Sequence, residues 1–217
     1  MTERDFPKNP RLETKRLVLR KPKKEDWKDL VEGLNEIEVT KNTSQIPHPY
    51  KKKDAIKFIK EARKKFRKRQ GYPFFLELKD KSKVIGCIDI SNINKFNGTA
   101  TTGSWVNKNY WKRGFITEAK IAANSFVFNK LGLRRLDSEV YANNEASNKT
   151  QKRLGYKYEG TRREAVKSKA SGKIHDSNVY GLLKEDWRKD SPDIKKHLQN
   201  KIKKLNKSTK KEIKKKI

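Results

Sequence analysis

The chain has 217 residues, which is long enough for one domain with a sizeable core and an appendage. Only 33% of the residues are hydrophobic and 38% are charged, and 56 Lys and Arg against 26 Asp and Glu give a net charge of +30. This excess predicts an affinity for polyanions, with nucleic acid first among them, although nonspecific attraction needs no dedicated site. The single cysteine, Cys87, excludes an internal disulfide and a cysteine-based metal cluster.

The remaining composition also argues against metal and membrane functions. His48, His175 and His197 are dispersed without metal-ligand spacing, so we expect no metal site and place all three at the surface. The sequence shows no signal peptide and no apolar run long enough to span a membrane. We therefore expect a cytoplasmic protein, with Cys87 buried in a strand.

The first elements are an arm, a strand and two helices. Residues 1–11 are polar and are expected to form a loose N-terminal arm, and residues 12–20 are expected to form a strand that ends before Pro22. Residues 24–36 and 51–70 have apolar side chains at helical spacing, which predicts two amphipathic helices. The Lys- and Arg-rich face of the second helix is either a solvated surface or an RNA-binding face.

After the second helix, strands and helices are mixed. They are strands at 74–79, 83–91 and 101–106, a helix at 115–131, a strand at 135–142, a short helix at 145–154, and strands at 157–167 and 177–183. Three consecutive strands and one internal β-α-β unit predict an α+β fold. We expect a mixed, mostly antiparallel twisted sheet of about seven strands, flanked by about four helices, over residues 12–190.

A basic segment, residues 191–217, closes the chain. Ser191 is the expected N-cap of a helix and Pro192 its first residue. Residues 188–217 hold 13 Lys and Arg against 3 Asp and Glu, a net charge of +10. Three interpretations remain open: a helix packed on the domain with a solvated face, a tether to RNA or the ribosome, and a membrane-surface helix.

The most informative stretch runs from Trp105 to Thr117, where a strand enters a helix through a turn that holds Lys112, Arg113 and Gly114. The start of a helix has unpaired N–H groups and a partial positive charge, and both can bind a phosphate. The two glycine-rich phosphate-binding motifs, Gly-x-Gly-x-x-Gly and Gly-x-x-x-x-Gly-Lys-Ser/Thr, are both missing from this stretch. An ordinary strand-to-helix turn therefore remains the alternative.

Four motifs in order give the chain a family resemblance over residues 12–187. They are the opening strand at 12–20, the stretch 103–119 with Gly114, the run 144–147 followed by 154–160, and the closing strand around 180–187. Together they resemble the GCN5-related N-acetyltransferases (GNAT), and most closely the RimJ/RimL-like branch that acetylates ribosomal-protein N-termini. The resemblance implies that acetyl-CoA donates an acetyl group to a primary amine, with no metal.

The sequence departs from the family pattern at two places. The family's acetyl-CoA loop usually reads Gln/Arg-x-x-Gly-x-Gly/Ala, but Trp111 and Ile116 occupy the outer positions here and only Gly114 matches. Ile116 is expected to narrow the approach to the loop. The branch often has a glutamate near Thr101, and a threonine cannot act as a base. The general base is therefore unassigned.

By residue matching, the resemblance assigns a cofactor site and two catalytic residues. The expected acetyl-CoA-binding residues are Trp105, Val106, Lys112, Arg113, Gly114, Phe115, Ile116, Thr117 and Asn144. A backbone N–H of Trp105 or Val106 would polarise the thioester, Asn144 would hold the pantetheine arm, and Ser147 would donate to the leaving thiolate. The alternatives are a helix cap for Ser147 and a turn residue for Asn144. Tyr156 is a second proton-donor candidate, and core packing is favoured for it.

The acceptor is expected to be a protein N-terminus, because an α-amino group has a pKa of about 7.7–8.0 and is partly neutral without a strong base. A lysine or polyamine amine, with a pKa near 10.4, costs about 3 kcal/mol more to deprotonate. Two other hypotheses stay open: a small-amine acetyltransferase acting on an antibiotic or polyamine, and a non-catalytic protein that holds RNA or the ribosome. The sequence leaves the oligomeric state open, a dimer included.

Overall fold

A computed structural model describes residues 6–214, with side chains through Leu205. The strands are β1 (Leu12–Glu13), β2 (Leu17–Arg20), β3 (Tyr72–Leu78), β4 (Val84–Asn94), β5 (Thr99–Val106), β6 (Arg135–Tyr141), β7 (Lys157–Lys167) and β8 (Ile174–Leu183). The helices are α1 (Trp27–Leu34), α2 (Ile37–Thr40), α3 (Lys52–Lys68), α4 (Phe115–Asn129), α5 (Glu145–Arg153) and α6 (Lys184–Lys214), with short 3-10 turns η2 (Lys24–Asp26) and η3 (Lys108–Tyr110).

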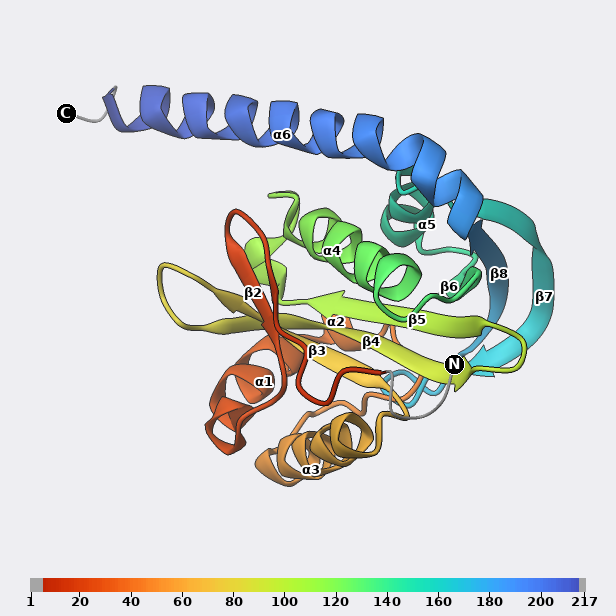
Figure 1. The fold of residues 1–217 in the computed structure, drawn as a ribbon. Helices are drawn as coiled ribbons and strands as arrows, with labels where there is room; N and C mark the ends of the chain where they lie inside the picture. Colours follow the sequence, from red (N-terminus) through yellow and green to blue (C-terminus); the bar gives the residue numbers. More distant parts are fainter. Residues whose placement is uncertain (1–5, 215–217) are drawn as a thin grey trace.

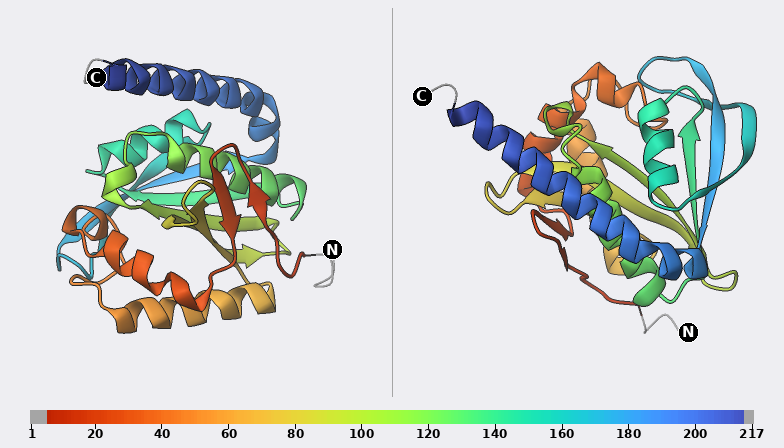
Figure 2. Two further views of the ribbon diagram at one scale, coloured as in Figure 1. Left: turned by 90° about the vertical axis from the view of Figure 1, so that its left-hand side faces the viewer. Right: turned by 90° about the horizontal axis from the view of Figure 1, so that it is seen from above.

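The strands form one eight-stranded sheet in the order β1-β2-β3-β4-β5-β6-β8-β7. Every neighbouring pair is antiparallel except β5 and β6, which are parallel and joined through α4. Helices cover both faces, with α4, α5 and α6 on one side and α1 and α3 on the other (Figure 1 and Figure 2). The expected α+β architecture with one internal β-α-β unit is confirmed.

Alternation along β5 divides the core between the two faces. Ala100 belongs to the apolar cluster under α4, whereas Trp105 belongs to the cluster under α1 and α3, with Cys87 beside it. The predicted burial of Cys87 is confirmed, and burial raises the pKa of its thiol. Even-numbered β5 residues therefore face α4 and odd-numbered residues face α1 and α3.

The N-terminal region differs from the prediction in two ways. The expected strand at 12–20 is two strands, because a turn in which the Thr14 backbone N–H donates to the Leu17 carbonyl (3.0 Å) folds the chain back. The loose arm is also wrong for the part that the structure describes. Phe6 is 2% exposed, the Lys95 ammonium lies 4.8 Å from its ring centroid, and the Tyr72 hydroxyl donates to the Pro7 carbonyl.

The C-terminal helix begins earlier than the sequence indicates. Ser191 is not an N-cap, since α6 starts at Lys184 and Pro192 lies inside it. Trp187 anchors this first part by packing against Phe128, with ring centroids 6.4 Å apart. A proline inside a helix removes a backbone hydrogen bond and bends it, and Figure 1 shows α6 bent in its N-terminal part.

After the bend, α6 crosses over α4 (Figure 2) and buries Leu198 and Ile202 in the core. Up to residue 205 the segment is therefore a helix packed on the domain, as the first of the three interpretations expects. The side chains beyond Leu205 lie outside the described residues. Within the described part of the chain, no helix combines the length and the apolar character that crossing a membrane requires.

Candidate active site

The middle of the sheet opens between β5 and β6. The two strands pair only at Thr99↔Arg135, Ala100↔Leu136 and Thr101↔Asp137, although both continue further. Beyond this point β5 stays paired with β4 as far as Val106, and β6 stays paired with β8 as far as Tyr141. The two strands therefore diverge into a wedge whose inner edges carry backbone groups without a neighbouring strand.

A cavity of about 230 Å³ occupies this wedge. Gly103 and Ser104 of β5 line it on one side, and Ser138 through Tyr141 of β6 line it on the other. The α4/α5 side contributes Lys120, Asn144, Ser147 and Gln151, and the opposite side contributes Asn42, Thr43, Ser44, Val166 and Ser177. The cavity is thus reached by residues from both faces of the sheet, as a site that joins two substrates requires.

The register of β5 decides which backbone groups face the wedge. The Asn107 N–H donates to the Ile85 carbonyl (2.8 Å). In an antiparallel pair every second residue is hydrogen-bonded to the neighbouring strand, so Trp105 and every second residue before it direct their N–H and C=O groups to β4. The N–H and C=O groups of Ser104 and Val106 consequently point toward β6, and the Val106 carbonyl accepts from the Trp111 indole N–H (2.8 Å). Of the predicted pair, Val106 turns its amide to the wedge and Trp105 does not.

The loop before α4 has the geometry of a phosphate cradle. Gly114 is the N-cap residue with φ +79°, and the first intrahelical N–H is that of Glu118, which donates to the Gly114 carbonyl (3.0 Å). The N–H groups of Phe115, Ile116 and Thr117 therefore have no partner within the helix. The side chain of Phe115 is buried, so this residue can contribute only its backbone.

Lys112 and Arg113 are exposed beside this helix start, where their charges add to its partial positive charge. Lys112 has φ +62°, a left-handed conformation that a non-glycine residue rarely adopts. The Arg113 carbonyl accepts from the Arg16 guanidinium (3.0 Å), which ties the loop to the β1–β2 turn. The loop is therefore held from behind while its charged side chains face solvent.

Helix α6 lies directly beside this loop. A Cβ atom added at Gly114 would lie 3.3 Å from Leu198 Cδ1, closer than ordinary contact. Both the positive φ and this approach require glycine at position 114. Sequence reasoning found the glycine from its motif but could not find the second reason, because Leu198 is 84 positions away in the chain.

Asn144 and Ser147 come together at the start of α5. The Asn144 side-chain oxygen accepts from the Ser147 backbone N–H (3.1 Å), so Asn144 is the N-cap. The cap alternative for Ser147 is wrong, and no hydrogen bond to its hydroxyl is found among the described residues. Both residues line the cavity. Tyr156 does not line it, because its hydroxyl donates to Asn124 inside the core (3.1 Å) and burial raises its pKa.

A buried lysine that the sequence analysis missed lies on the same side of the cavity. Lys120 is 2% exposed, and its ammonium donates to Gln151 Oε1 at 3.3 Å. The Gln151 amide in turn donates to the Ser138 hydroxyl (2.6 Å). Burial lowers the pKa of Lys120 to about 8. In the sequence, a lysine at a helical position between Ala119 and Ile121 was the only signal.

A carboxylate was also missed on the opposite face. Glu139 lines the cavity and is the only acidic residue to do so among the described residues. Its carboxylate accepts from Arg162 (2.9 Å) and from the Ser177 hydroxyl (3.3 Å). The predicted alternation of residues 135–142 already placed Glu139 apart from Leu136 and Val140, which pack in the core under α4. Thr101, at the position where the branch often has glutamate, pairs with Asp137 where the wedge begins.

Tyr141, which lines the cavity, takes part in an aromatic stack. The rings of Tyr141 and His175 lie 4.2 Å apart and are inclined by 6°. His48 and His175 are partly buried and His197 is exposed, so the expected surface placement holds fully for His197 alone. The described residues contain no group of His, Cys, Asp and Glu that could hold a metal ion.

The family model "Acetyltransferase (GNAT) domain" matches residues 16–157, more than half of the chain. The chain belongs to the GNAT acetyltransferase family. It is therefore an acetyl-CoA-dependent acetyltransferase, and the wedge, the free amides of β5 and the open start of α4 are features that fit acetyl-CoA.

The GNAT chain is similar to several curated and solved proteins. It is 30% identical to "Uncharacterized N-acetyltransferase p20" of Bacillus licheniformis over 178 residues, covering 81% of this chain and 97% of the relative. It is 31% identical to "Putative ribosomal N-acetyltransferase YdaF" of Bacillus subtilis, over 48% of this chain and 56% of the relative. The crystal structure of microcin C7 self immunity acetyltransferase MccE, in complex with acetyl-CoA and AMP, matches with a TM-score of 0.70 at 22% identity, covering 78% and 93% of the two chains. This likeness shows that the two chains share a fold.

Proposed function

We propose that this GNAT enzyme acetylates the N-terminal α-amine of a protein, such as a ribosomal protein. The observation that carries the proposal is the small number of acidic residues that line the cavity. Glu139 is the only acidic residue that lines the cavity in the described part of the chain, and Arg162 already neutralises much of its charge. A single shared carboxylate suits one amine better than a polycationic polyamine, which several carboxylates would bind.

Among the described residues, Glu139 is the only carboxylate that lines the cavity, and one weak base supports the same acceptor. An α-amine with a pKa of about 7.7–8.0 needs little help to become neutral, whereas a lysine amine needs far more. We assign to Glu139 the role of accepting the proton that the amine loses, directly or through one water. The ribosomal class of acceptor is further supported by the similarity to YdaF, whose printed name describes a ribosomal N-acetyltransferase.

The proposed donor site uses this chain's own residues as follows. The free amides of residues 115–117, the flexible Gly114 and the charges of Lys112 and Arg113 bind the pyrophosphate of acetyl-CoA. The Val106 N–H, which faces the wedge, polarises the thioester carbonyl in place of the Trp105 amide. The Asn144 amide nitrogen, whose oxygen already caps α5, remains to hold the pantetheine arm.

A substrate screen tests the proposed acceptor. Purified enzyme and acetyl-CoA are given peptides with the N-terminal sequences of ribosomal proteins, the same peptides with formylated N-termini, spermidine and an aminoglycoside. Mass spectrometry locates the acetyl group. Turnover of the free peptides at the α-nitrogen, with none of the formylated ones, is the expected result. Turnover confined to spermidine or the aminoglycoside would replace the proposal with a small-amine acetyltransferase.

A further inference from the structure

The ammonium of Lys120 is an unusually placed charge. It is 2% exposed, lies on α4 and lines the wedge cavity beside Ser138 and Gln151. It can donate three hydrogen bonds, and in the part of the chain that the structure describes only Gln151 Oε1 accepts one, at 3.3 Å. Among the described residues no carboxylate forms an ion pair with it. A buried cation without a counter-ion is costly unless a ligand completes its contacts.

Among the described residues, the groups recorded in contact with the Lys120 ammonium are uncharged. Gln151 reaches it from α5, Ser138 follows from β6 through the Gln151 amide, and the Tyr156 ring lies 5.6 Å from its ammonium. The Tyr156 hydroxyl points to Asn124, and burial keeps it protonated by raising its pKa. Glu139 lies on the opposite face of β6, where Arg162 holds it. A ligand in the cavity can therefore supply the negative partner that the described residues do not.

We propose that the Lys120 ammonium stabilises and protonates the sulfur of coenzyme A as it leaves the thioester. This inference rests on the wedge as the thioester site in the proposed function. Lys120 and Ser147 share the α4/α5 side of the cavity, and Glu139 lines the other side. The leaving sulfur and the attacking amine are different substituents of the thioester carbon, so an acid and a base on the two sides of the cavity can serve them separately.

The step balances as follows. Glu139, directly or through one water, first removes one proton from the protonated acceptor amine, and the neutral nitrogen then attacks the thioester carbon. The C–S bond breaks and the sulfur leaves with the electron pair. Lys120 gives one proton to the sulfur, and the new amide nitrogen loses its extra proton to water. Lys120 is then neutral and regains a proton from solvent. The products are the N-acetylated acceptor and coenzyme A with its thiol restored.

The acidities of the groups favour Lys120 over Ser147 as the source of the proton. A thiol has a pKa of about 8.5, and a serine hydroxyl is a far weaker acid than a thiol. Ser147 can therefore donate a hydrogen bond to the sulfur but cannot by itself protonate it. Burial lowers the pKa of Lys120 to about 8, close to that of the thiol, which is the match that efficient proton transfer requires. Gln151 and Ser138 are positioning residues that hold the ammonium.

The decisive experiment measures bound coenzyme A without any acetyl transfer. The ultraviolet absorbance of the thiolate is followed against pH for coenzyme A bound to wild type, to Lys120→Met and to Lys130→Met. Lys130 is an exposed lysine at the C-terminal end of the same helix, so its removal is the matched control. We expect the bound thiol to ionise about one pH unit lower in wild type and Lys130→Met than in Lys120→Met, about tenfold in the thiolate ratio at a given pH.

A sulfur-free ligand separates the sulfur contact from general loss of binding. Desulfo-coenzyme A lacks the thiol, so its affinity should be the same for wild type and Lys120→Met, whereas coenzyme A should bind Lys120→Met more weakly above pH 8.

With a substrate amine, Lys120→Met should lower kcat about 100-fold and leave the KM for acetyl-CoA nearly unchanged. Lys120→Arg keeps the charge and should retain the lowered thiol pKa.

The proposal is overturned if the bound thiol ionises at the same pH in wild type and Lys120→Met, or if both proteins distinguish coenzyme A from desulfo-coenzyme A equally. Should Lys120→Met fail to fold, the thiolate titration of wild type against free coenzyme A decides instead, since an unshifted bound thiol is incompatible with a neighbouring ammonium. These measurements need no acceptor. A wrong acceptor class would leave them unchanged, so the failure of this inference and that of the proposed function are distinguishable.

Discussion

The guanidinium of Arg16 and the carboxylate of Glu118 form an ion pair, with Nε and Oε2 2.7 Å apart, that fastens the β1–β2 turn to the first turn of α4. The same carboxylate accepts from the Thr14 hydroxyl (2.6 Å) and the Arg16 backbone N–H (2.9 Å), and Glu118 is only 5% exposed. Arg16 also stacks over the Phe115 ring at 4.1 Å. The two residues therefore hold the loop that we assign to the pyrophosphate of acetyl-CoA.

Glu118→Gln tests this anchor. The amide keeps the shape of the carboxylate but leaves the partly buried guanidinium without a counter-charge, so we expect a loss of about 2–4 kcal/mol in the free energy of unfolding. Urea denaturation measures it, and calorimetry with acetyl-CoA should show weaker binding at low temperature, where the variant remains folded. Glu145→Gln removes an exposed ion pair with Lys149 and should change neither quantity. Equal effects of the two substitutions would contradict the assignment.

Gly114→Ala tests the close approach of α6. The residue has φ +79° and a Cβ would lie 3.3 Å from Leu198 Cδ1, so we expect about 1–2 kcal/mol of destabilisation from the backbone plus a displacement of Leu198. Gly172→Ala is the matched control, because Gly172 has φ +70° but no atom within 4 Å of its Cβ position. Gly114→Ala should lose more stability than Gly172→Ala, and only Gly114→Ala should weaken acetyl-CoA binding.

Lys120→Met should stabilise the protein in a pH-dependent way. Burial lowers the pKa of Lys120 from 10.5 to about 8, so between these values the unfolded chain binds a proton that the folded one does not. The destabilisation is complete below pH 8 and is relieved as pH rises to 10.5, a change of about 3 kcal/mol. At pH 7 the variant should unfold at higher urea concentration than wild type, with the difference vanishing near pH 10.5. A constant difference would show that the charge is not what costs stability.

Glu139→Gln tests the proposed base. The variant should lose about 100-fold in kcat near neutral pH, and the loss should shrink above the pKa of the substrate amine, where no proton remains to be removed before attack. A pH–rate profile from pH 6 to 10 measures both effects. Asp137→Asn is the control, since Asp137 lies on the same face of β6 but binds Arg135 and does not line the cavity. A uniform loss at all pH values would assign Glu139 to structure instead.

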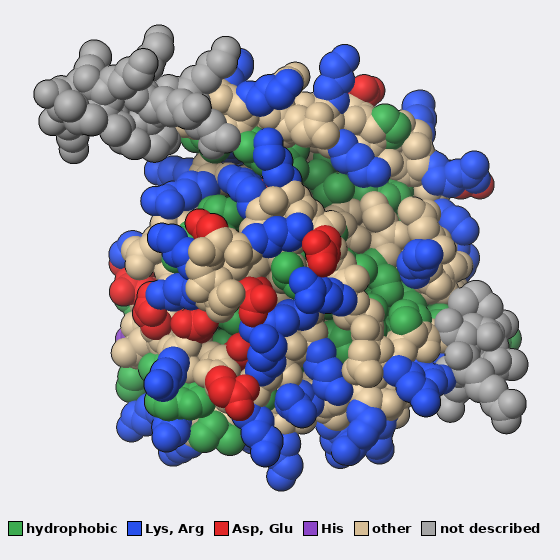
Figure 3. Space-filling view, turned by 60° about the vertical axis from the view of Figure 1, so that its left-hand side comes forward, with side chains coloured by type: hydrophobic (Ala, Val, Ile, Leu, Met, Phe, Trp, Pro, Cys, Tyr) green, Lys and Arg blue, Asp and Glu red, His purple; other side chains and the backbone are tan. Residues whose placement is uncertain are grey.

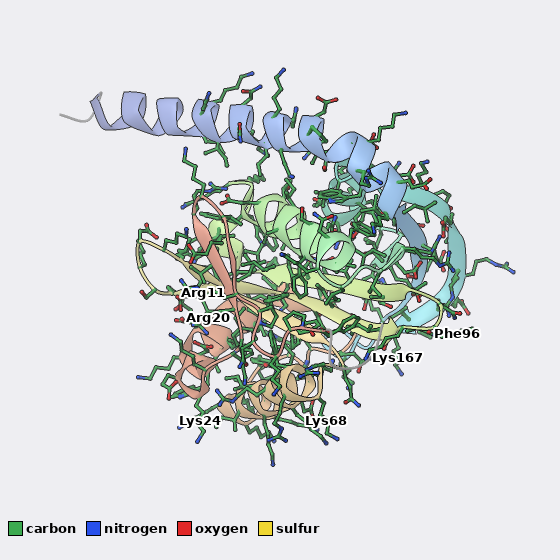
Figure 4. All side chains as sticks on the ribbon, in the orientation of Figure 1. Arg11, Arg20, Lys24, Lys68, Phe96 and Lys167 are labelled. Carbon is green, nitrogen blue, oxygen red and sulfur yellow. The ribbon has the colours of Figure 1, made fainter. Side chains whose placement is uncertain are left out.

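The exposed lysines of α6 provide a test of the interpretation in which the basic C-terminal segment tethers the enzyme to RNA or the ribosome. Figure 3 shows Lys and Arg spread over the whole face that it presents, and Figure 4 shows Lys24 and Lys68 on the α1/α3 side, away from α6. Charge alone therefore does not select one surface. Replacing Lys195, Lys196 and Lys203 with Glu should abolish salt-sensitive sedimentation with ribosomes, whereas the equal charge change at Lys53, Lys57 and Lys60 of α3 should not. Equal losses would indicate nonspecific attraction.

The C-terminal segment shows where local sequence signals mislead. Ser191 and Pro192 have the composition of a helix start, yet the helix continues through them from Lys184. The burial of Trp187, at 2% exposed, and of Leu198, at 8%, fixes α6 on both sides of Pro192. Tertiary packing therefore outweighs the local preference, and truncation after Trp187 would uncover the core instead of merely removing a charged tail.

The sequence by itself determined the order of strands and helices, the family, the glycine at 114 and the chemistry of acetyl transfer, because hydrophobic periodicity and motif order are properties of neighbouring residues. Only the tertiary structure decided that Val106 and not Trp105 faces the wedge, that Leu198 lies against Gly114, and that Lys120 and Glu139 line one cavity from opposite faces. Strand register and the crossing of α6 over α4 set these relationships, and both arise from contacts between residues far apart in the chain.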